Sequence, residues 1–169
     1  TDAEVPENWL SRLVNPLLLD SKIASITPYS NSATICSFPE FCKDNDLPIG
    51  MQLNEIDSIF RLYGGTETVD IPTGVGFCML MNRECIEKYG IFDSIYGKGY
   101  GEENDWCMRT FEEGYHNVMI TNLFVYHKHG VSFLEHKDKL KQDRINENLS
   151  ILESRYPQYN ELVQNFIKS

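Results

Sequence analysis

The order of hydrophobic and polar residues predicts several short strands. Residues 22–28 and 68–71 alternate and are rich in β-branched side chains, which is typical of strands. The apolar run 77–81 is bounded by turn-forming residues and reads as a buried strand. Two further apolar runs, 118–120 and 123–126, are expected to form two separate strands.

Helical periodicity separates these strands. Helices are expected over residues 6–15, 54–63, 83–89 and 134–169, with a further one beginning after Gly101. Pro6 suits a first helical turn, whereas Pro16 and Pro157 should interrupt the helices in which they lie. Asn54 is a typical N-cap for the second helix.

The segment 97–109 carries the most concentrated candidate chemistry. Three alternating glycines precede three carboxylates, namely Gly97, Gly99 and Gly101 before Glu102, Glu103 and Asp105. Glycine permits positive φ, and a helix N-terminus favours the ionised carboxylate that a base or metal ligand requires. Asp105 and Arg109 are four residues apart and should pair on one helix face. Acids in a first helical turn are also ordinary helix-start signals, so both interpretations stay open.

Composition narrows the class of protein. The 169 residues suffice for one domain, and 41% hydrophobic and 12% aromatic content indicates a folded globule. A net charge of −10 makes nucleic acid an unfavourable partner, and an anionic substrate would require a metal ion or a local basic patch. The sequence contains no run of about eighteen apolar residues, so no transmembrane segment is predicted.

The cysteines indicate a reducing compartment. There are five, an odd number without CxxC spacing, which favours free thiols and a cytoplasmic location, although a Cys36–Cys42 bridge stays open. Peripheral attachment to the inner membrane face is a further option. Asn148 begins an Asn-Leu-Ser glycosylation signal, but a predicted helix in a cytoplasmic chain argues against its use.

Two histidines follow the last predicted strand. His127 and His129 could ligate Mn, Zn or Fe, since neutral imidazole suits these ions. Alternatively they alternate faces of a strand end, one buried and one in water.

Several motifs recur in an order that points to a known family. They are Pro72-Thr73-Gly74-Val75-Gly76-Phe77-Cys78-Met79, Gly90-Ile91-Phe92-Asp93, Gly99-Tyr100-Gly101-Glu102-Glu103-Asn104-Asp105 and Val125-Tyr126-His127. Ile26-Thr27-Pro28, the segment 33–39 and Tyr156-Pro157-Gln158-Tyr159 agree with them. Together they resemble the second half of a bacterial family 2 glycosyltransferase with the GT-A fold.

The resemblance covers nearly the whole chain and implies its fold. It implies an α/β, Rossmann-like partial GT-A domain with a mixed sheet and C-terminal helices. Residues 1–133 would form the acceptor-side half, and residues 134–169 a C-terminal helical extension. In this family an Asp/Asn-x-Asp motif precedes a Pro-x-x-Trp-Leu helix, and Asp2 falls on its last acid. The resemblance therefore implies a fragment whose nucleotide-binding half lies upstream of Thr1.

The resemblance also assigns roles. Asp2 and His127 would hold Mn²⁺ or Mg²⁺, which neutralises the diphosphate of a nucleotide-sugar donor. Glu103 occupies the position of the general base, and Asp105 is the substitute candidate. Glu102 would position the acceptor or close the loop. Inverting transfer would deliver the sugar to a glycan or lipid-linked acceptor in polysaccharide biosynthesis.

Two loops would contact the substrate. The residues expected to do so are Thr73, Gly74, Gly76, Gly99, Tyr100 and Gly101. The glycines between residues 74 and 77 would let an acceptor approach the backbone, and a tight turn explains the same glycines.

Two other classes of function remain. Paired acids also serve glycoside hydrolases, but Glu102 and Glu103 are expected to point in diverging directions, whereas a hydrolase needs acids that face each other. A non-catalytic sugar-binding module would bind glycans without needing a metal ion or the acidic cluster.

Overall fold

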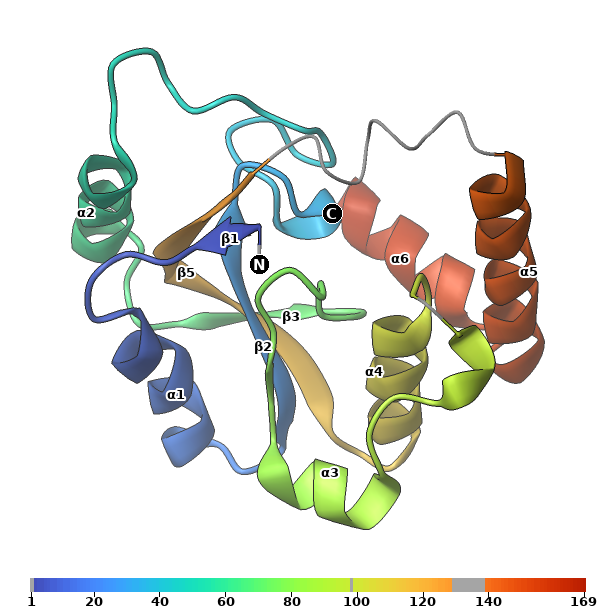
Figure 1. The fold of residues 1–169 in the computed structure, drawn as a ribbon. Coiled ribbons are helices and arrows are strands. Elements are labelled where there is room, and N and C mark those ends of the chain that lie inside the picture. The colour runs from blue at the N-terminus through green and yellow to red at the C-terminus, as the bar shows by residue number, and fades with distance from the viewer. Residues whose placement is uncertain (1, 98, 129–138) are drawn as a thin grey trace.

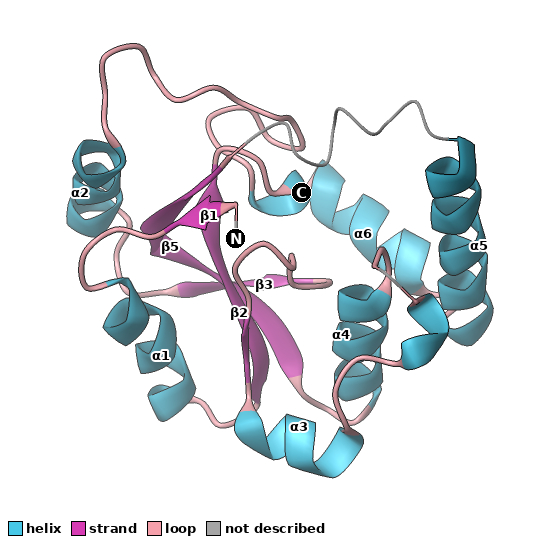
Figure 2. Cartoon of the chain, in the orientation of Figure 1, coloured by secondary structure: helices cyan, strands magenta, loops and turns pink. Residues whose placement is uncertain are grey.

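The computed structural model describes residues 2–97, 99–128 and 139–169, in which helices surround one mixed sheet (Figure 1). The strands are β1 (Ala3–Glu4), β2 (Ile23–Ser30), β3 (Thr68–Ile71), β4 (Leu80–Met81) and β5 (His116–His127). The α-helices are α1 (Trp9–Leu19), α2 (Leu53–Tyr63), α3 (Arg83–Tyr89), α4 (Glu102–Glu112), α5 (Lys139–Arg155) and α6 (Tyr159–Lys168). Single 3₁₀ turns cover Thr34–Cys36 and Ser94–Tyr96. This arrangement confirms the predicted α/β class with a mixed sheet and C-terminal helices (Figure 2).

The long strand β5 organises the sheet. It runs parallel to β2 and antiparallel to β1 and β3, while β4 pairs with the other edge of β2. The prediction of two separate strands over 118–126 is wrong, because β5 is continuous. The interruption read from the sequence is a bulge, where the partners of β2 change from Ile120 to Phe124 between Pro28 and Tyr29.

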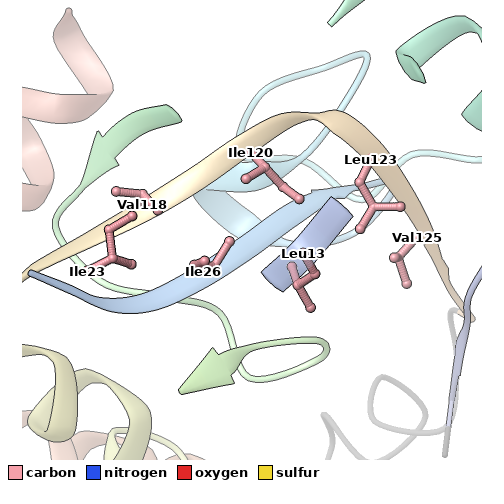
Figure 3. Packing of buried hydrophobic residues seen from close by; sticks show 7 residues of the cluster. All are labelled: Leu13, Ile23, Ile26, Val118, Ile120, Leu123 and Val125. Atoms are coloured by element: carbon pink, nitrogen blue, oxygen red, sulfur yellow. The ribbon is translucent and has the colours of Figure 1, made fainter. Parts of the chain in front are cut away.

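One hydrophobic cluster joins α1 to the sheet (Figure 3). Its buried members are Leu13 from α1, Ile23 and Ile26 from β2, and Val118, Ile120, Leu123 and Val125 from β5. Burying each such aliphatic side chain contributes about 1.5–3 kcal/mol. The central parallel pair, β2 and β5, therefore supplies most of the buried side chains of this cluster.

A second set of contacts fixes α4. Trp106 and Cys107 are fully buried with Ala24 of β2 and Cys85 of α3. Met108 packs in another cluster with α5 and α6, which lie beside α4 in Figure 1. Because α4 is held from several sides, the direction of its N-terminus is determined by packing.

The first helix differs from the prediction. Pro6 lies before α1, and Pro16 lies inside the helix without ending it. Leu17, on the far side of Pro16, packs against the core cluster, so tertiary packing outweighs the lost hydrogen bond. Leu10, near the start of the same helix, is 54% exposed.

Two further local predictions need correction. Gln52, and not Asn54, caps α2, through a capping box with Glu55. The run 77–81 forms a strand only at Leu80–Met81, although Phe77 and Cys78 still pack against the core. The predicted bounds of β3 and α3 are confirmed.

Other predictions concern covalent state and membrane association. The five cysteines are free, so the Cys36–Cys42 bridge is not formed. Among the described residues, no helix is both long and apolar enough to cross a membrane. The predicted domain boundary between residues 133 and 134, the predicted helix over 134–138 and His129 lie outside the described residues.

Candidate functional site

The loop before α4 has the backbone conformation that its glycines predict. Gly99, Tyr100 and Gly101 have φ values of 110°, 73° and 110°, all in the left-handed half of the map. A Cβ on Gly101 would lie 3.1 Å from the Tyr96 ring, so a larger residue would meet both strain and a neighbour. The Gly101 carbonyl accepts the Asp105 backbone N–H at 2.8 Å and begins the helix. The loop therefore turns sharply into the acidic first turn of α4.

Glu103 lies in an environment suited to a base. Burial, the neighbouring Glu102 charge and a side-chain contact with Glu102 raise its pKa from 4.5 to about 6, although backbone N–H groups oppose the change. Its Oε2 atom is buried without a hydrogen-bond partner. Glu103 also lines a cavity of about 380 Å³. A carboxylate with a pKa near 6 accepts protons more readily than an ordinary glutamate does.

Glu102 contacts Glu103. The prediction that the two side chains diverge is wrong, because their carboxyl groups lie within hydrogen-bonding reach of each other. Oε2 of Glu102 is likewise buried without a partner. The contact and the Glu102 charge both contribute to the raised pKa of Glu103, after burial, which is the largest cause.

Asp105 is held by basic and phenolic groups. Its side chain is 1% exposed and accepts from Arg109 at 3.0 Å, which confirms the predicted pair. Arg155 of α5 donates at 2.8 Å and the Tyr96 hydroxyl at 3.1 Å. Both carboxylate oxygens are therefore occupied. These contacts favour a structural role for Asp105 over that of a substitute base.

The segment between Pro72 and Phe77 is fixed by buried polar atoms. The Gly74 N–H donates to Sγ of Cys107 at 3.3 Å, and the Val75 N–H donates to Oγ1 of Thr27 at 3.2 Å. A Cβ on Gly74 would lie 2.4 Å from Sδ of Met79. Close packing, rather than positive φ, therefore explains why glycine occupies position 74.

The same segment connects two parts of the site. Gly76 lies so close to Glu103 that an added Cβ would be 3.8 Å from its carboxyl group. The ring of the next residue, Phe77, stacks on the His127 imidazole with a centroid distance of 5.3 Å. One short loop thus contacts both the candidate base and the candidate metal ligand.

Helix α6 closes the cavity beside Glu103. Tyr159, Val163 and Ile167 line it together with Thr73. The Tyr159 hydroxyl hydrogen-bonds the Thr73 side chain, while burial and the Glu103 charge raise the pKa of Tyr159 to about 12. The sequence motif containing Tyr159 was noted, but its contact with residue 73 depends on the packing of α6.

The structure brings Asp2 and His127 together from opposite ends of the described chain. Ala3 of β1 pairs with His127 of β5, which places Asp2 beside the histidine. Nε2 of His127 lies 3.2 Å from Oδ2 of Asp2. Burial raises the pKa of Asp2, but its backbone N–H and His127 outweigh burial and hold that pKa below its ordinary value.

Neighbouring backbone groups set the orientation of His127. Its Nδ1 atom lies 2.7 Å from the Ser32 carbonyl, which can only accept, so Nδ1 carries a proton. In the neutral ring, Nε2 then directs a lone pair at the Asp2 carboxylate. A proton or a cation between Nε2 and Oδ2 would relieve this repulsion, and the arrangement fits the donor set of a divalent ion.

Asn31 supports this histidine. Its side-chain amide donates to the His127 carbonyl at 2.9 Å, and its Oδ1 accepts the His127 N–H at 2.8 Å. Asn31 is 1% exposed. Sequence reasoning missed Asn31 and Ser32, because an isolated asparagine or serine in a loop carries no spacing signal for a partner about 95 residues away.

Metal coordination here would need ligands beyond these side chains. Within residues 2–97, 99–128 and 139–169, no group of three or more His, Cys, Asp or Glu side chains is placed to hold an ion. Mg²⁺ and Mn²⁺ sites commonly combine one or two protein ligands with water and substrate phosphates. Asp2 and His127 fit that incomplete type of site.

Comparisons with known proteins identify no family. A scan against protein-family models found no match, and a search of curated proteins found none either. The resemblance to family 2 glycosyltransferases and the nucleotide-binding half expected upstream of Thr1 therefore stay predictions.

Proposed function

We propose that this chain forms the acceptor side of an inverting, metal-dependent glycosyltransferase, which transfers a sugar from a nucleotide-sugar donor to a glycan or lipid-linked hydroxyl. The observation that carries this proposal is Glu103. It is a half-buried carboxylate with a pKa of about 6 and a buried, unpartnered oxygen, at the wall of a cavity large enough for a small ligand.

The chemistry assigned to Glu103 is general-base catalysis. Its carboxylate would accept the proton of an acceptor hydroxyl while that oxygen attacks the anomeric carbon of the donor. The bond from this carbon to the diphosphate breaks on the opposite face, so the configuration inverts. Glu102 would position the acceptor indirectly, through its contact with Glu103.

The charge of the cavity favours the acceptor over the donor. The described residues that line the cavity include the acidic side chain of Glu103 and no Lys, Arg or His. A diphosphate would be repelled there, whereas neutral hydroxyls can satisfy the unpaired carboxylate oxygen. The apolar side chains of Val163 and Ile167 suit the C–H face of a sugar ring.

The donor phosphates would lie near Asp2 and His127. These residues would hold Mn²⁺ or Mg²⁺, which supplies charge neutralisation for the diphosphate leaving group when bound. His127 is held in position by Ser32 and by Asn31, and Phe77 stacks on its ring. The segment that contains Phe77 also approaches Glu103 through Gly76, so it can set the distance between donor and acceptor.

The glycoside hydrolase alternative is weaker. Hydrolases separate their two carboxyl groups by about 5–9.5 Å so that a glycosidic bond fits between them. Glu102 and Glu103 instead contact each other, which leaves no such space.

The proposal is tested by turnover in the natural full-length protein with Mn²⁺, a panel of nucleotide sugars and a glycan acceptor library. Glu103→Gln keeps the size of the side chain but removes the base, so kcat should fall by roughly 10²–10⁴-fold. Donor affinity should be unchanged, because Glu103 does not face the diphosphate. Glycan binding without any transfer, unaffected by Mn²⁺ and by Glu103→Gln, would instead identify a non-catalytic binding module.

A further inference from the structure

The helix α5 reaches into the loop that presents Glu103. Asn148 of α5 is 4% exposed, and its amide nitrogen lies 3.0 Å from the Tyr96 and Gly99 carbonyls and 2.9 Å from the Tyr100 carbonyl. About fifty residues separate this side chain from its acceptors. One amide therefore binds carbonyls on both sides of the segment that joins the 3₁₀ turn Ser94–Tyr96 to α4.

The backbone of that loop is strained at Tyr100. Tyr100 has a φ of 73°, a conformation that a residue with a Cβ adopts at a penalty. Strained backbone persists only where the surroundings hold it. The side-chain amide of Asn148 stabilises this backbone, because it donates to the Gly99 and Tyr100 carbonyls on either side of the strained φ of Tyr100.

Packing reinforces the same connection. A Cβ on Gly101 would lie 3.8 Å from Cβ of Asn148, so the start of α4 lies directly against α5. Glu103 lies two residues after Gly101, in the first turn of α4. The direction in which the chain leaves Gly101 therefore sets the position of Glu103. A shift of the loop would move Glu103 away from Gly76 and from the cavity.

We propose that Asn148 is a positioning residue, which holds Tyr96 and the loop residues 99–101 so that Glu103 stays at the cavity beside Gly76. The proposal rests on the proposed function, in which Glu103 is the base. It adds to the site a residue of α5, which lies outside the acidic motif of α4. Asn148 itself touches no reacting atom.

Three carbonyl acceptors explain why asparagine suits the position. A carboxylate at residue 148 would face three carbonyl oxygens and repel them, and a methyl group would remove the amide that now donates to them. The same contacts make Asn148 unavailable for glycosylation in the folded protein, in agreement with the sequence-based expectation.

The test compares Asn148→Ala with Asn146→Ala, a matched change at an exposed asparagine of the same helix. Carbon-13 NMR of labelled glutamate measures the pKa of Glu103, whose surroundings are Glu102, Cys107 and Tyr159. In Asn148→Ala this pKa should fall from about 6 toward 4.5, because the loop no longer keeps Glu103 buried beside Glu102. Asn146→Ala should leave it unchanged.

Two further measurements separate positioning from stability. Amide hydrogen exchange should accelerate at residues 99–103 in Asn148→Ala while exchange in β5 stays at the wild-type rate. In the natural full-length protein, kcat should fall by up to about 10²-fold with little change in donor KM. Asn148→Ser retains one donor and should give a smaller change of the same kind, which keeps the test usable where the alanine variant does not fold.

The outcomes are distinct. A lower melting temperature with an unchanged Glu103 pKa and unchanged loop exchange would reduce Asn148 to a structural residue and overturn the inference. Failure to detect transfer in the wild-type protein would refute the proposed function, whereas the NMR and exchange results would still decide whether Asn148 positions Glu103.

Discussion

The role of Asp105 can be decided by replacing it with asparagine. Asp105→Asn keeps the shape of the side chain and removes the charge that faces Arg109 and Arg155. The Asp105 side chain is 1% exposed, whereas those of Arg109 and Arg155 are 27% and 36% exposed. The guanidinium groups can therefore recover some hydration after the change, although Asp105 itself is enclosed by protein.

These exposures set the expected magnitude. Removing one partner of a buried ion pair costs about 3–5 kcal/mol, and the partial exposure of both arginines favours the lower end, about 3 kcal/mol. In a domain of this size each kcal/mol lowers the melting temperature by about 2–4 °C, so a decrease of roughly 6–12 °C is expected. Urea denaturation monitored by circular dichroism, beside a thermal melt, measures both quantities.

A matched control is available on the same arginine. Asp93 pairs with Arg155 at 2.9 Å, and both side chains are 36% exposed. Asp93→Asn should cost under about 1 kcal/mol, since exposed ion pairs contribute little. If Asp105→Asn were no more destabilising than this control and still abolished transfer, the structural role would be refuted and Asp105 would be the base.

Three other changes test separate parts of the site. Glu103 has a pKa raised from 4.5 to about 6 in the folded protein, so the stability that its protonated form contributes is lost as pH rises through 6. Glutamine cannot ionise, so at pH 8 the Glu103→Gln variant should be more stable than the wild type by roughly 2 kcal/mol. Equal urea midpoints for the two proteins at pH 8 would contradict this. Gly101→Ala, with a φ of 110° and Tyr96 at 3.1 Å, should cost about 1–3 kcal/mol by urea denaturation, more than Gly114→Ala, where φ is 83° and the space is open. His127→Ala should abolish Mn²⁺ binding in calorimetry whereas His116→Ala, whose ring also meets carboxylates, should not; equal affinity in both variants would remove His127 from the metal site.

Local rules predicted the parts of the fold that depend on neighbours in the sequence. The Asp105–Arg109 pair follows from helical spacing, and the positive φ values follow from the glycines around Tyr100. The bounds of α3 were predicted because Gly90 stops the helix. Each of these features is encoded within a few residues of where it appears.

Features set by distant packing were predicted poorly. Pro16 stays inside α1 because Leu17 is anchored in the core, and no local pattern indicates that anchor. Asn31, Tyr159 and Asn148 act on partners from other parts of the fold. The meeting of Asp2 with His127 was expected only from the resemblance, since it requires β1 to pair with the end of β5.

Two carboxylates on the first turn of α4 show how one helix end can serve two purposes. Glu103 and Asp105 both lie in the first turn of α4, near the positive end of the same helix dipole. Asp105 meets two guanidinium groups that compensate its charge, and this makes it a bridge between α4 and α5. The pKa of Glu103 is raised first by burial and then by the charge of Glu102, and the described lining of its cavity holds no basic side chain to compensate. The difference in partners, rather than in position along the helix, supports a structural role for Asp105 and is the basis for proposing Glu103 as the base.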